Sequence, residues 1–326
     1  MKLGVFSILF NNLSIDQVLD YLEKSSIFNI EIGAGGYSRS NHIDLDYILS
    51  DDSHVKEYLD KFQRKNITIT ALGAQGNPVH PDAAKATRYH EDFQKTVLAA
   101  QKLGVKTILL LSGCPGGNQA DLTPNWITCP WPDDFALALD YQWNEVLIPY
   151  WKKAVDFAEN HGIEKLAIEP HPGFCVYNPE TLLKLRNAVS NSIGINFDPS
   201  HLFWQGIDPV LAINEVKDCI FHVHAKDCSV NKANCITNGI LDSKPYSDFR
   251  NRSWNFRSVG YGQSLETWKN IISALVSVGY SGVISIEHED ALMTAEEGIE
   301  KAVEFLNNII IKNDVKTKWW EMRSEG

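Results

Sequence analysis

Four apolar segments of the sequence each end in a carboxylate or an imidazole. They are Leu166-Ala167-Ile168-Glu169, Ile195-Asn196-Phe197-Asp198, His222-Val223-His224 and Ile284-Ser285-Ile286-Glu287. Three carboxylates and one imidazole form a mostly oxygen ligand set without a thiolate, which suits Mn²⁺, Mg²⁺ or Co²⁺ and also accepts Zn²⁺. Any one of these residues alone is explained as well by a cap or an ion pair. Four at successive segment ends favour a shared metal site.

The four segments belong to an alternation of short β-rich runs and longer patterns with helical spacing, such as Phe93, Val97, Ala100 and Leu103. Eight runs are predicted as strands: residues 3–7, 29–32, 67–72, 107–112, 165–169, 194–197, 220–224 and 283–287. The last helix is expected from 295 to about 311. No linker-like stretch or shift of composition divides residues 1–326. We therefore predict one α/β domain, a closed parallel (β/α)₈ barrel, with an open doubly wound sheet as the alternative.

Such a barrel places the four polar groups on one rim. Neighbouring strands are about 4.8 Å apart, so groups at the ends of adjacent strands can converge on one point. Three long connections, from residue 33 to about 52, from 113 to about 140 and from 226 to 264, follow the second, fourth and seventh strands. Because ligands bind at the face where strands end, these connections are expected to wall a pocket. Trp126, Trp131 and Trp254 lie within them, either as sugar contacts or as anchors of the loops.

Composition restricts the class of partner. The net charge of -11 and the pI near 5.4 disfavour a nucleic-acid partner, which requires clustered Lys and Arg. No stretch reaches the roughly 18 apolar residues of a membrane span, and the N-terminus lacks the features of a secretory signal, so we expect a cytoplasmic protein. The six cysteines include no CxxC pair and are expected to be reduced thiols.

Longer motifs around the four residues resemble those of the xylose isomerase-like barrel superfamily, in particular its sugar phosphate isomerase/epimerase group, with the related tagatose epimerases and inosose dehydratases. The resemblance covers nearly the whole chain. The motifs are Ile168-Glu169-Pro170-His171, Phe197-Asp198-Pro199-Ser200-His201, His222-Val223-His224-Ala225-Lys226-Asp227 and Ser285-Ile286-Glu287-His288-Glu289-Asp290. They indicate the fold more specifically than they indicate the substrate.

The resemblance implies roles for individual residues. Glu169, Asp198, His224 and Glu287 are expected to bind the metal, and His201 to hydrogen-bond the substrate. Glu169 and Glu287 are also expected to be catalytic: one removes a proton next to a carbonyl while the metal stabilises the enediolate, and the other delivers a proton. The same chemistry serves isomerisation, epimerisation and β-elimination.

Further residues near the rim are candidates for contact with the substrate. Lys226 is expected either to orient a substrate oxygen or to form a salt bridge, and His171 to contact the substrate or a metal ligand. His80, in Gly76-Asn77-Pro78-Val79-His80-Pro81, and Arg257, near the end of the long connection after the seventh strand, are also candidates. His222 points the same way as His224 and is expected to be a hydrogen-bonded core residue.

The sequence therefore predicts an isomerase or epimerase of a small sugar or keto-sugar that uses one divalent ion, with Mn²⁺ expected first. No Gly-rich phosphate cradle is found, so an unphosphorylated carbohydrate is favoured. The main alternative is a lyase or dehydratase of oxidised sugars, such as an inosose dehydratase or an enzyme cleaving 3-keto-glycosides or C-glycosides. An AP-endonuclease-like enzyme is a minor alternative, because Leu110-Leu111-Ser112-Gly113 carries no histidine and no Asp-x-His pair precedes Gly260. A homo-oligomer is possible, and no interface is indicated.

Overall fold

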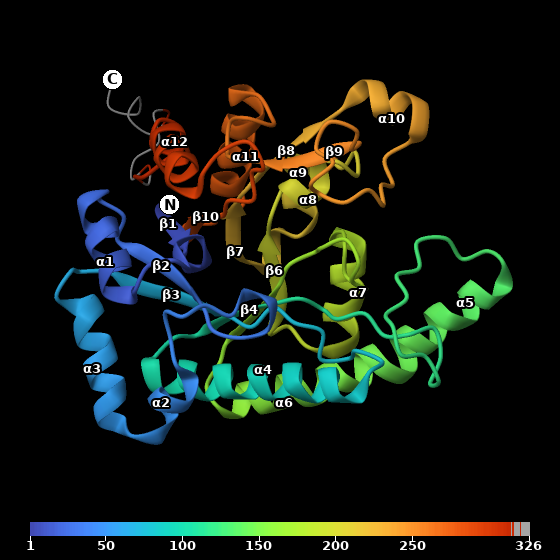
Figure 1. The fold of residues 1–326 in the computed structure, drawn as a ribbon, viewed down its shortest axis with the longest axis horizontal. Helices are drawn as coiled ribbons and strands as arrows, with labels where there is room; N and C mark the ends of the chain where they lie inside the picture. Colours follow the sequence, from blue (N-terminus) through green and yellow to red (C-terminus); the bar gives the residue numbers. More distant parts are fainter. Residues whose placement is uncertain (314, 316–319, 321–326) are drawn as a thin grey trace.

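The eight apolar runs form a closed barrel of parallel strands (Figure 1). The computed structural model describes residues 1–313, 315 and 320. The barrel strands are β1 Lys2–Phe6, β2 Asn29–Gly33, β3 Thr68–Gly73, β4 Thr107–Leu110, β5 Lys165–Ile168, β6 Ile193–Phe197, β7 Ile220–Ala225 and β10 Val283–Ile286. They follow one another around the barrel in the order β1-β10-β7-β6-β5-β4-β3-β2. The predicted (β/α)₈ fold is therefore confirmed, and the open sheet is excluded.

Helices cover the outside of the barrel. Those that return the chain to the next strand are α1 Ile15–Lys24, α3 Asp52–Gln63, α4 Ala83–Leu103, α6 Ile148–Asn160, α7 Pro179–Val189, α9 Pro209–Glu215, α11 Leu265–Ser277 and α12 Ala295–Asn307. Most begin at a polar residue whose side chain accepts a hydrogen bond from a backbone N–H of the first turn, as Asp82 does for α4 and Ser264 for α11. The N-terminal ammonium group of Met1 donates to the carbonyl of Ile311, so the first strand and the segment after α12 lie together.

Side chains of alternate strand residues divide between the barrel interior and the helix layer. Leu72, Ile108, Leu110 and Ile168 belong to the main hydrophobic core that includes the helices. Their neighbours Ala71, Leu109 and Ala167 form a separate cluster, as expected for side chains that point into the barrel. Because Glu169 follows Ala167 by two residues, this alternation directs its side chain inward as well.

The long connections carry structure of their own. The connection after β2 contains the 3₁₀ turn η2 Gly36–Ser38 and the helix α2 Leu45–Ser50. Three short elements lie elsewhere: the 3₁₀ turns η1 Ser7–Phe10 and η4 Lys217–Cys219, and the helix α8 Ser200–Phe203, which follows β6. After β4 the chain runs through a long loop into α5 Asp133–Asp140 and the π-helical turn η3 Tyr141–Leu147, which continues into α6. After β7 it forms β8 Asp227–Val230, α10 Lys232–Asn238 and β9 Trp254–Arg257. Strands β8 and β9 pair antiparallel outside the barrel.

Asp227 fastens the connection after β7 to the barrel. Its Oδ2 accepts hydrogen bonds from the backbone N–H groups of Gly260, Gly262 and Gln263, and from the indole of Trp268. Trp254 is buried, with its ring stacked on Trp204 at a centroid distance of 4.8 Å. Trp254 is therefore an anchor of this connection, whereas Trp131 is 75% exposed.

The free cysteines agree with the expectation of reduced thiols. All six cysteines lie among the described residues and are free thiols. In the part of the chain that the structure describes, no helix has the length and apolarity needed to cross a membrane.

Candidate metal centre

The four predicted metal ligands lie together at one end of the barrel. Glu169 follows β5, Asp198 follows β6, His224 belongs to β7 and Glu287 follows β10, and these four strands are consecutive around the barrel. One donor atom of each residue can be chosen so that all four lie within 4.8 Å of one another. The side chains of His224 and Asp198 are fully buried, and that of Glu287 is 12% exposed.

This group of donors fits a divalent cation. Oδ2 of Asp198 and Oε2 of Glu287 are buried and accept no hydrogen bond of good geometry, although each lies about 3 Å from Nζ of Lys226. Buried carboxylate oxygens without a donor are costly unless a cation or a hydrogen bond compensates them. Three carboxylates and one imidazole also match the ligand chemistry of Mn²⁺, Mg²⁺, Co²⁺ or Zn²⁺. The identity of the ion remains a prediction.

Glu31 is part of the site and was not predicted from the sequence. It lies in the middle of β2, is fully buried, and accepts hydrogen bonds at Oε2 from Nε2 of His224 at 2.9 Å and from Oγ of Ser285 at 3.2 Å. Nε2 of His222 lies 3.2 Å from the same oxygen, so His222 is a hydrogen-bonded core residue as predicted. The available signal was a single acid inside an otherwise apolar strand, Asn29-Ile30-Glu31-Ile32.

Contact with Glu31 fixes the orientation of His224. Because Nε2 of His224 donates to Glu31, Nδ1 is the nitrogen that faces the other ligands, at 2.9 Å from Glu287 and 3.4 Å from Glu169. Burial lowers the pKa of His224, but the carboxylates of Glu31 and Glu287 outweigh burial and raise it well above its usual value. Nδ1 is therefore the nitrogen that faces a metal ion, and it would release its proton on binding one.

Glu169 is held by two neighbours. Asn196, two residues before Asp198 on the same strand, donates from Nδ2 to Oε2 of Glu169 at 2.9 Å. Nε2 of His201 lies 2.9 Å from Oε1 of Glu169 and 3.2 Å from Oδ2 of Asp198. Although burial raises the pKa of Glu169, hydrogen bonds from His201 and His224 hold it well below its usual value. Glu169 is thus an ionised carboxylate with a fixed orientation.

His201 lies beneath the cavity rather than on its surface. Burial, with the nearby His171 and Lys226, lowers the pKa of His201 to about 3, so the imidazole is neutral and donates to Glu169. The ring of His171 lies 4.3 Å from that of His201 and lines the cavity above the predicted metal site. His171 is therefore placed to meet a ligand, whereas contact between His201 and the substrate stays a prediction.

Lys226 is a fully buried cation among carboxylates. Its Nζ lies 3.1 Å from Asp198, 3.0 Å from Glu287 and 3.1 Å from Glu289. Burial lowers the pKa of Lys226, but these carboxylates outweigh burial and raise it well above its usual value. In turn, burial and the charges of Glu169 and Glu287 raise the pKa of Asp198 to about 7 in spite of Lys226. Lys226 both lines the cavity and neutralises part of the acidic cluster.

The remaining two candidates lie elsewhere. Nδ1 of His80 accepts a hydrogen bond from the backbone N–H of Asp82 at the start of α4. Nε of Arg257 donates to Oδ2 of Asp290 at 2.9 Å and so ties β9 to the loop after β10. Neither residue is among those that line the cavity above the four predicted ligands. A role for either in substrate binding stays a prediction.

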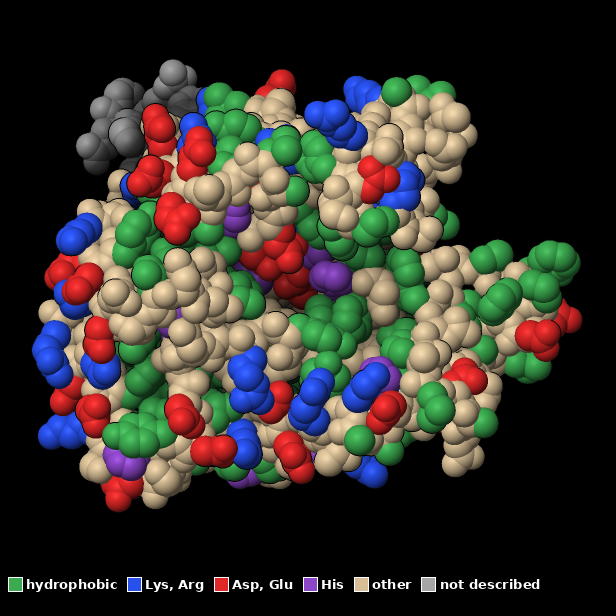
Figure 2. All heavy atoms as spheres, viewed as in Figure 1, with side chains coloured by type: hydrophobic (Ala, Val, Ile, Leu, Met, Phe, Trp, Pro, Cys, Tyr) green, Lys and Arg blue, Asp and Glu red, His purple; other side chains and the backbone are tan. Residues whose placement is uncertain are grey.

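The cavity above the site has a volume of about 400 Å³. Figure 2 shows acidic and histidine side chains at the floor of a hollow in the middle of this face. Phe6, Tyr37, Gln75, Leu111, His171 and Lys226 are among its lining residues, together with Glu169, Glu287, His288 and Glu289. The connections after β2 and β7 therefore contribute to its wall, as predicted.

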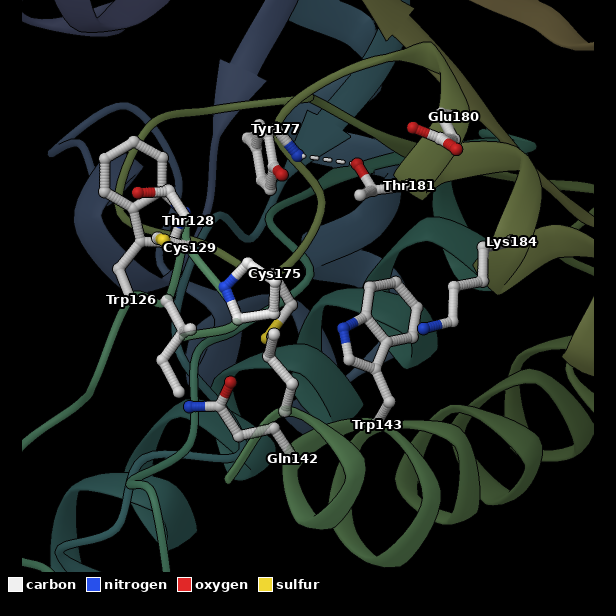
Figure 3. Close-up of a pocket in the computed structure, with 13 residues that line it drawn as sticks. Trp126, Thr128, Cys129, Gln142, Trp143, Cys175, Tyr177, Glu180, Thr181 and Lys184 are labelled. Carbon is white, nitrogen blue, oxygen red and sulfur yellow. Dashed lines mark hydrogen bonds between the residues drawn. The ribbon is translucent and has the colours of Figure 1, made fainter. Parts of the chain in front are cut away.

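The connection after β4 also walls a cavity, as predicted, but not this one. That connection borders a separate cavity of about 280 Å³, whose lining includes Trp126, Trp143 of η3, Tyr177 of the segment leading into α7 and Lys184 of α7 itself (Figure 3). The rings of Trp126 and Tyr177 make a T-shaped contact, with centroids 5.7 Å apart. This cavity contains none of the four predicted metal ligands.

Comparisons with known proteins agree on the architecture. A family model described as xylose isomerase-like TIM barrel matches residues 30–309. The uncharacterized protein YfiH of Bacillus subtilis (strain 168) is 41% identical over 313 residues, which cover 95% of this chain and 99% of that protein. A solved structure of an IOLI protein with a zinc atom has a TM-score of 0.65 at 20% identity, covering 95% of this chain and 98% of that chain. A D-tagatose 3-epimerase-like protein has a TM-score of 0.60 at 21% identity, with coverages of 95% and 98%.

Proposed function

The chain belongs to the xylose isomerase-like TIM barrel family, and from that premise and the geometry of its rim we propose that it is a metal-dependent isomerase or epimerase of a small keto-sugar. Two ionised carboxylates on either side of one imidazole carry this proposal. Nδ1 of His224 lies within 3.4 Å of both Glu169 and Glu287. Because proteins of this fold serve many functions, these residues, and not the fold alone, support the proposal.

The proposed reaction begins with removal of a proton from a carbon next to the substrate carbonyl. Either Glu169 or Glu287 accepts the proton, and the electron pair of the broken C–H bond moves to the carbonyl oxygen to give an enediolate. A bound divalent ion supplies positive charge that stabilises such an oxygen. A proton then returns to the same carbon from the other face in an epimerisation, or to the neighbouring carbon in an isomerisation.

The charge state of the two glutamates suits this role. Burial alone would raise the pKa of Glu287, but Lys226 and His224 lower it to about 2. Glu169 is also held ionised, by His201 and His224. Either residue is therefore ready to accept a proton. In an isomerisation the residue that accepts the proton can return it to the neighbouring carbon, whereas in an epimerisation the other glutamate takes up a proton from solvent before it delivers one to the opposite face. Because Glu169 and Lys226 are buried at the base of the cavity, bulk water has little access to these two side chains.

Solvent exchange tests this proposal directly. The metal-restored protein is incubated in D₂O with a panel of ketoses and 3-keto-glycosides, and deuterium next to the carbonyl is followed by NMR. We expect exchange in at least one substrate, and a loss of several powers of ten in Glu169→Gln. The exposed Glu164→Gln serves as the matched control and keeps full activity. Exchange that is as fast in Glu169→Gln as in the wild type would contradict the assignment.

A lyase acting on an oxidised glycoside is the second candidate, and one observation favours it. A further cavity adjoins the one above the predicted metal site, which leaves room for a leaving group. Elimination shares the first proton transfer with epimerisation and differs in the loss of the group β to the carbanion. Product analysis separates the two, because only a lyase releases the second part of a glycoside.

A further inference from the structure

A second cavity, of about 320 Å³, lies beside the one above the predicted metal centre. Its lining residues are His171, Tyr246, Asn255, Phe256, Glu289 and Ala291. His171 and Glu289 also line the first cavity, so these two side chains form the boundary between the two spaces. The two cavities are therefore neighbours, and a ligand that spanned both would pass His171 and Glu289.

The wall of the second cavity is aromatic. The rings of Tyr246 and Phe256 lie nearly parallel, with centroids 5.9 Å apart and an interplanar angle of 20°. Phe256 is buried and reaches the metal-site residues, since its ring centroid lies 5.2 Å from that of His201 and 4.8 Å from Nζ of Lys226. Tyr246 is 54% exposed and forms the outer part of the wall.

Several contacts hold this wall in place. The guanidinium carbon of Arg252 lies 4.2 Å from the ring centroid of Tyr246 and 4.8 Å from that of Trp254. Trp254 is itself stacked on Trp204, which follows α8 of the barrel. The second cavity is thus a preformed feature of the connection after β7, as is common for small-molecule sites.

The charges around the two cavities indicate an uncharged ligand in the second one. Its one ionisable acid is Glu289, whose side chain is 49% exposed, and no Lys or Arg is among the residues that line it. Lys226, at the floor of the first cavity, already lies within 3.1 Å of three carboxylates. A phosphate or carboxylate in the second cavity would therefore find no free cation there, whereas the apolar face of a sugar ring or an aryl ring packs well on Tyr246 and Phe256.

We propose that the second cavity binds an uncharged second ring of the substrate, so that the natural substrate is a glycoside of a keto-sugar and not a free ketose. The keto-sugar ring lies over Glu169 and Glu287, and the ring joined to it by the glycosidic bond lies against Tyr246 and Phe256. This inference rests on the proposed function for the location of the keto-sugar. It adds a residue, Tyr246, that determines which substrate is accepted.

Binding of a matched pair of ligands tests the inference. Methyl and phenyl 3-keto-glucosides differ only in the group that would enter the second cavity. Calorimetry measures the affinity of each compound for the metal-restored protein and for protein to which no metal has been added. We expect the phenyl compound to bind about tenfold more tightly. In Tyr246→Ala this preference should fall to about twofold or less. Tyr261→Ala, which removes an exposed tyrosine of the same connection that lines neither cavity, should keep the preference.

The same samples distinguish failure of the inference from failure of the proposed function. Equal affinities for the two compounds, or a preference that survives in Tyr246→Ala, would overturn the second-ring site even where solvent deuterium enters the methyl compound or a free ketose. Tighter binding of the phenyl compound that Tyr246→Ala abolishes supports the site. Absence of exchange in every substrate would overturn the proposed function and, with it, the position assigned to the keto-sugar.

Discussion

Nε2 of His224 lies 2.9 Å from Oε2 of Glu31, a residue 193 positions earlier in the chain. This hydrogen bond joins β7 to β2 across the interior of the barrel and turns Nδ1 of His224 toward Glu169 and Glu287. A carboxylate that holds the far nitrogen of a ligating histidine fixes its tautomer and raises its basicity. Glu31 is therefore expected to act on the metal through His224.

Replacing Glu31 by Gln tests this relationship. The amide keeps the size of the side chain but removes the negative charge that holds the Nε2–H group of His224. We expect metal affinity to fall by about 10- to 100-fold while the circular dichroism spectrum is unchanged. Isothermal titration with Mn²⁺ or Zn²⁺ measures the effect, and Glu57→Gln on the surface is the control. Unchanged affinity in Glu31→Gln would show that His224 needs no such partner.

Replacing Lys226 by Met tests whether this cation compensates the acidic cluster. Removing it leaves the buried carboxylate of Asp198 without its nearest cation and that of Glu287 with His224 as its remaining cationic neighbour. We expect the free energy of unfolding in the presence of EDTA to fall by about 3–5 kcal/mol, the usual cost of breaking a buried ion pair. Added Mn²⁺ should recover more stability in Lys226→Met than in the wild type, because the ion then provides the missing charge.

Urea denaturation with and without metal measures both quantities. The exposed Lys152→Met is the matched control and should change neither. A Lys226→Met variant that is as stable as the wild type in EDTA would contradict the claim that Lys226 neutralises Asp198 and Glu287.

The pH dependence of stability should contain a contribution from His42. Burial lowers the pKa of this imidazole below its usual value, and its contact at 3.1 Å with the carbonyl of Phe10 offsets only part of that effect. Below the ordinary histidine pKa of about 6.5 the unfolded chain therefore binds a proton that the folded chain does not, so this contribution to stability is lost as the pH falls. We expect the stability lost between about pH 7.5 and pH 5.5 to be smaller in His42→Gln than in the wild type. Denaturation curves at the two pH values measure it, and an equal loss in both proteins would refute it.

The barrel could be predicted from the sequence because each strand carries its own local signal. Short β-rich runs such as Leu166-Ala167-Ile168 alternate with amphipathic helical segments, and eight such units leave few other architectures. The predicted ligands could be found for the same reason, since Glu169 and Asp198 directly follow strands. Their position directly after a strand was sufficient to predict that they lie together at the rim of the barrel.

Other parts of the site depend on contacts between distant segments, and their local signals are weak. Within its strand, only the charge of Glu31 distinguishes it from its apolar neighbours. Its partners His224 and Ser285 are more than 190 residues away in the chain. No periodicity reveals the pairing of β8 with β9 or the hydrogen bonds that Asp227 accepts from Gly260 and Gly262. Arg257 was predicted at the mouth, but the structure directs its Nε to Asp290.

The central claim is that Glu169, Asp198, His224 and Glu287 bind one divalent ion, and metal analysis of two proteins tests it most directly. The wild type and Asp198→Ala are purified, dialysed against Mn²⁺, Mg²⁺, Co²⁺ or Zn²⁺ and freed of excess ion before elemental analysis. We predict about one ion per chain in the wild type for at least one of these metals, and its loss in the variant, because Asp198 provides one of the four donors. An equal absence of metal from both proteins after this treatment would contradict the account and leave the four residues with a structural role only.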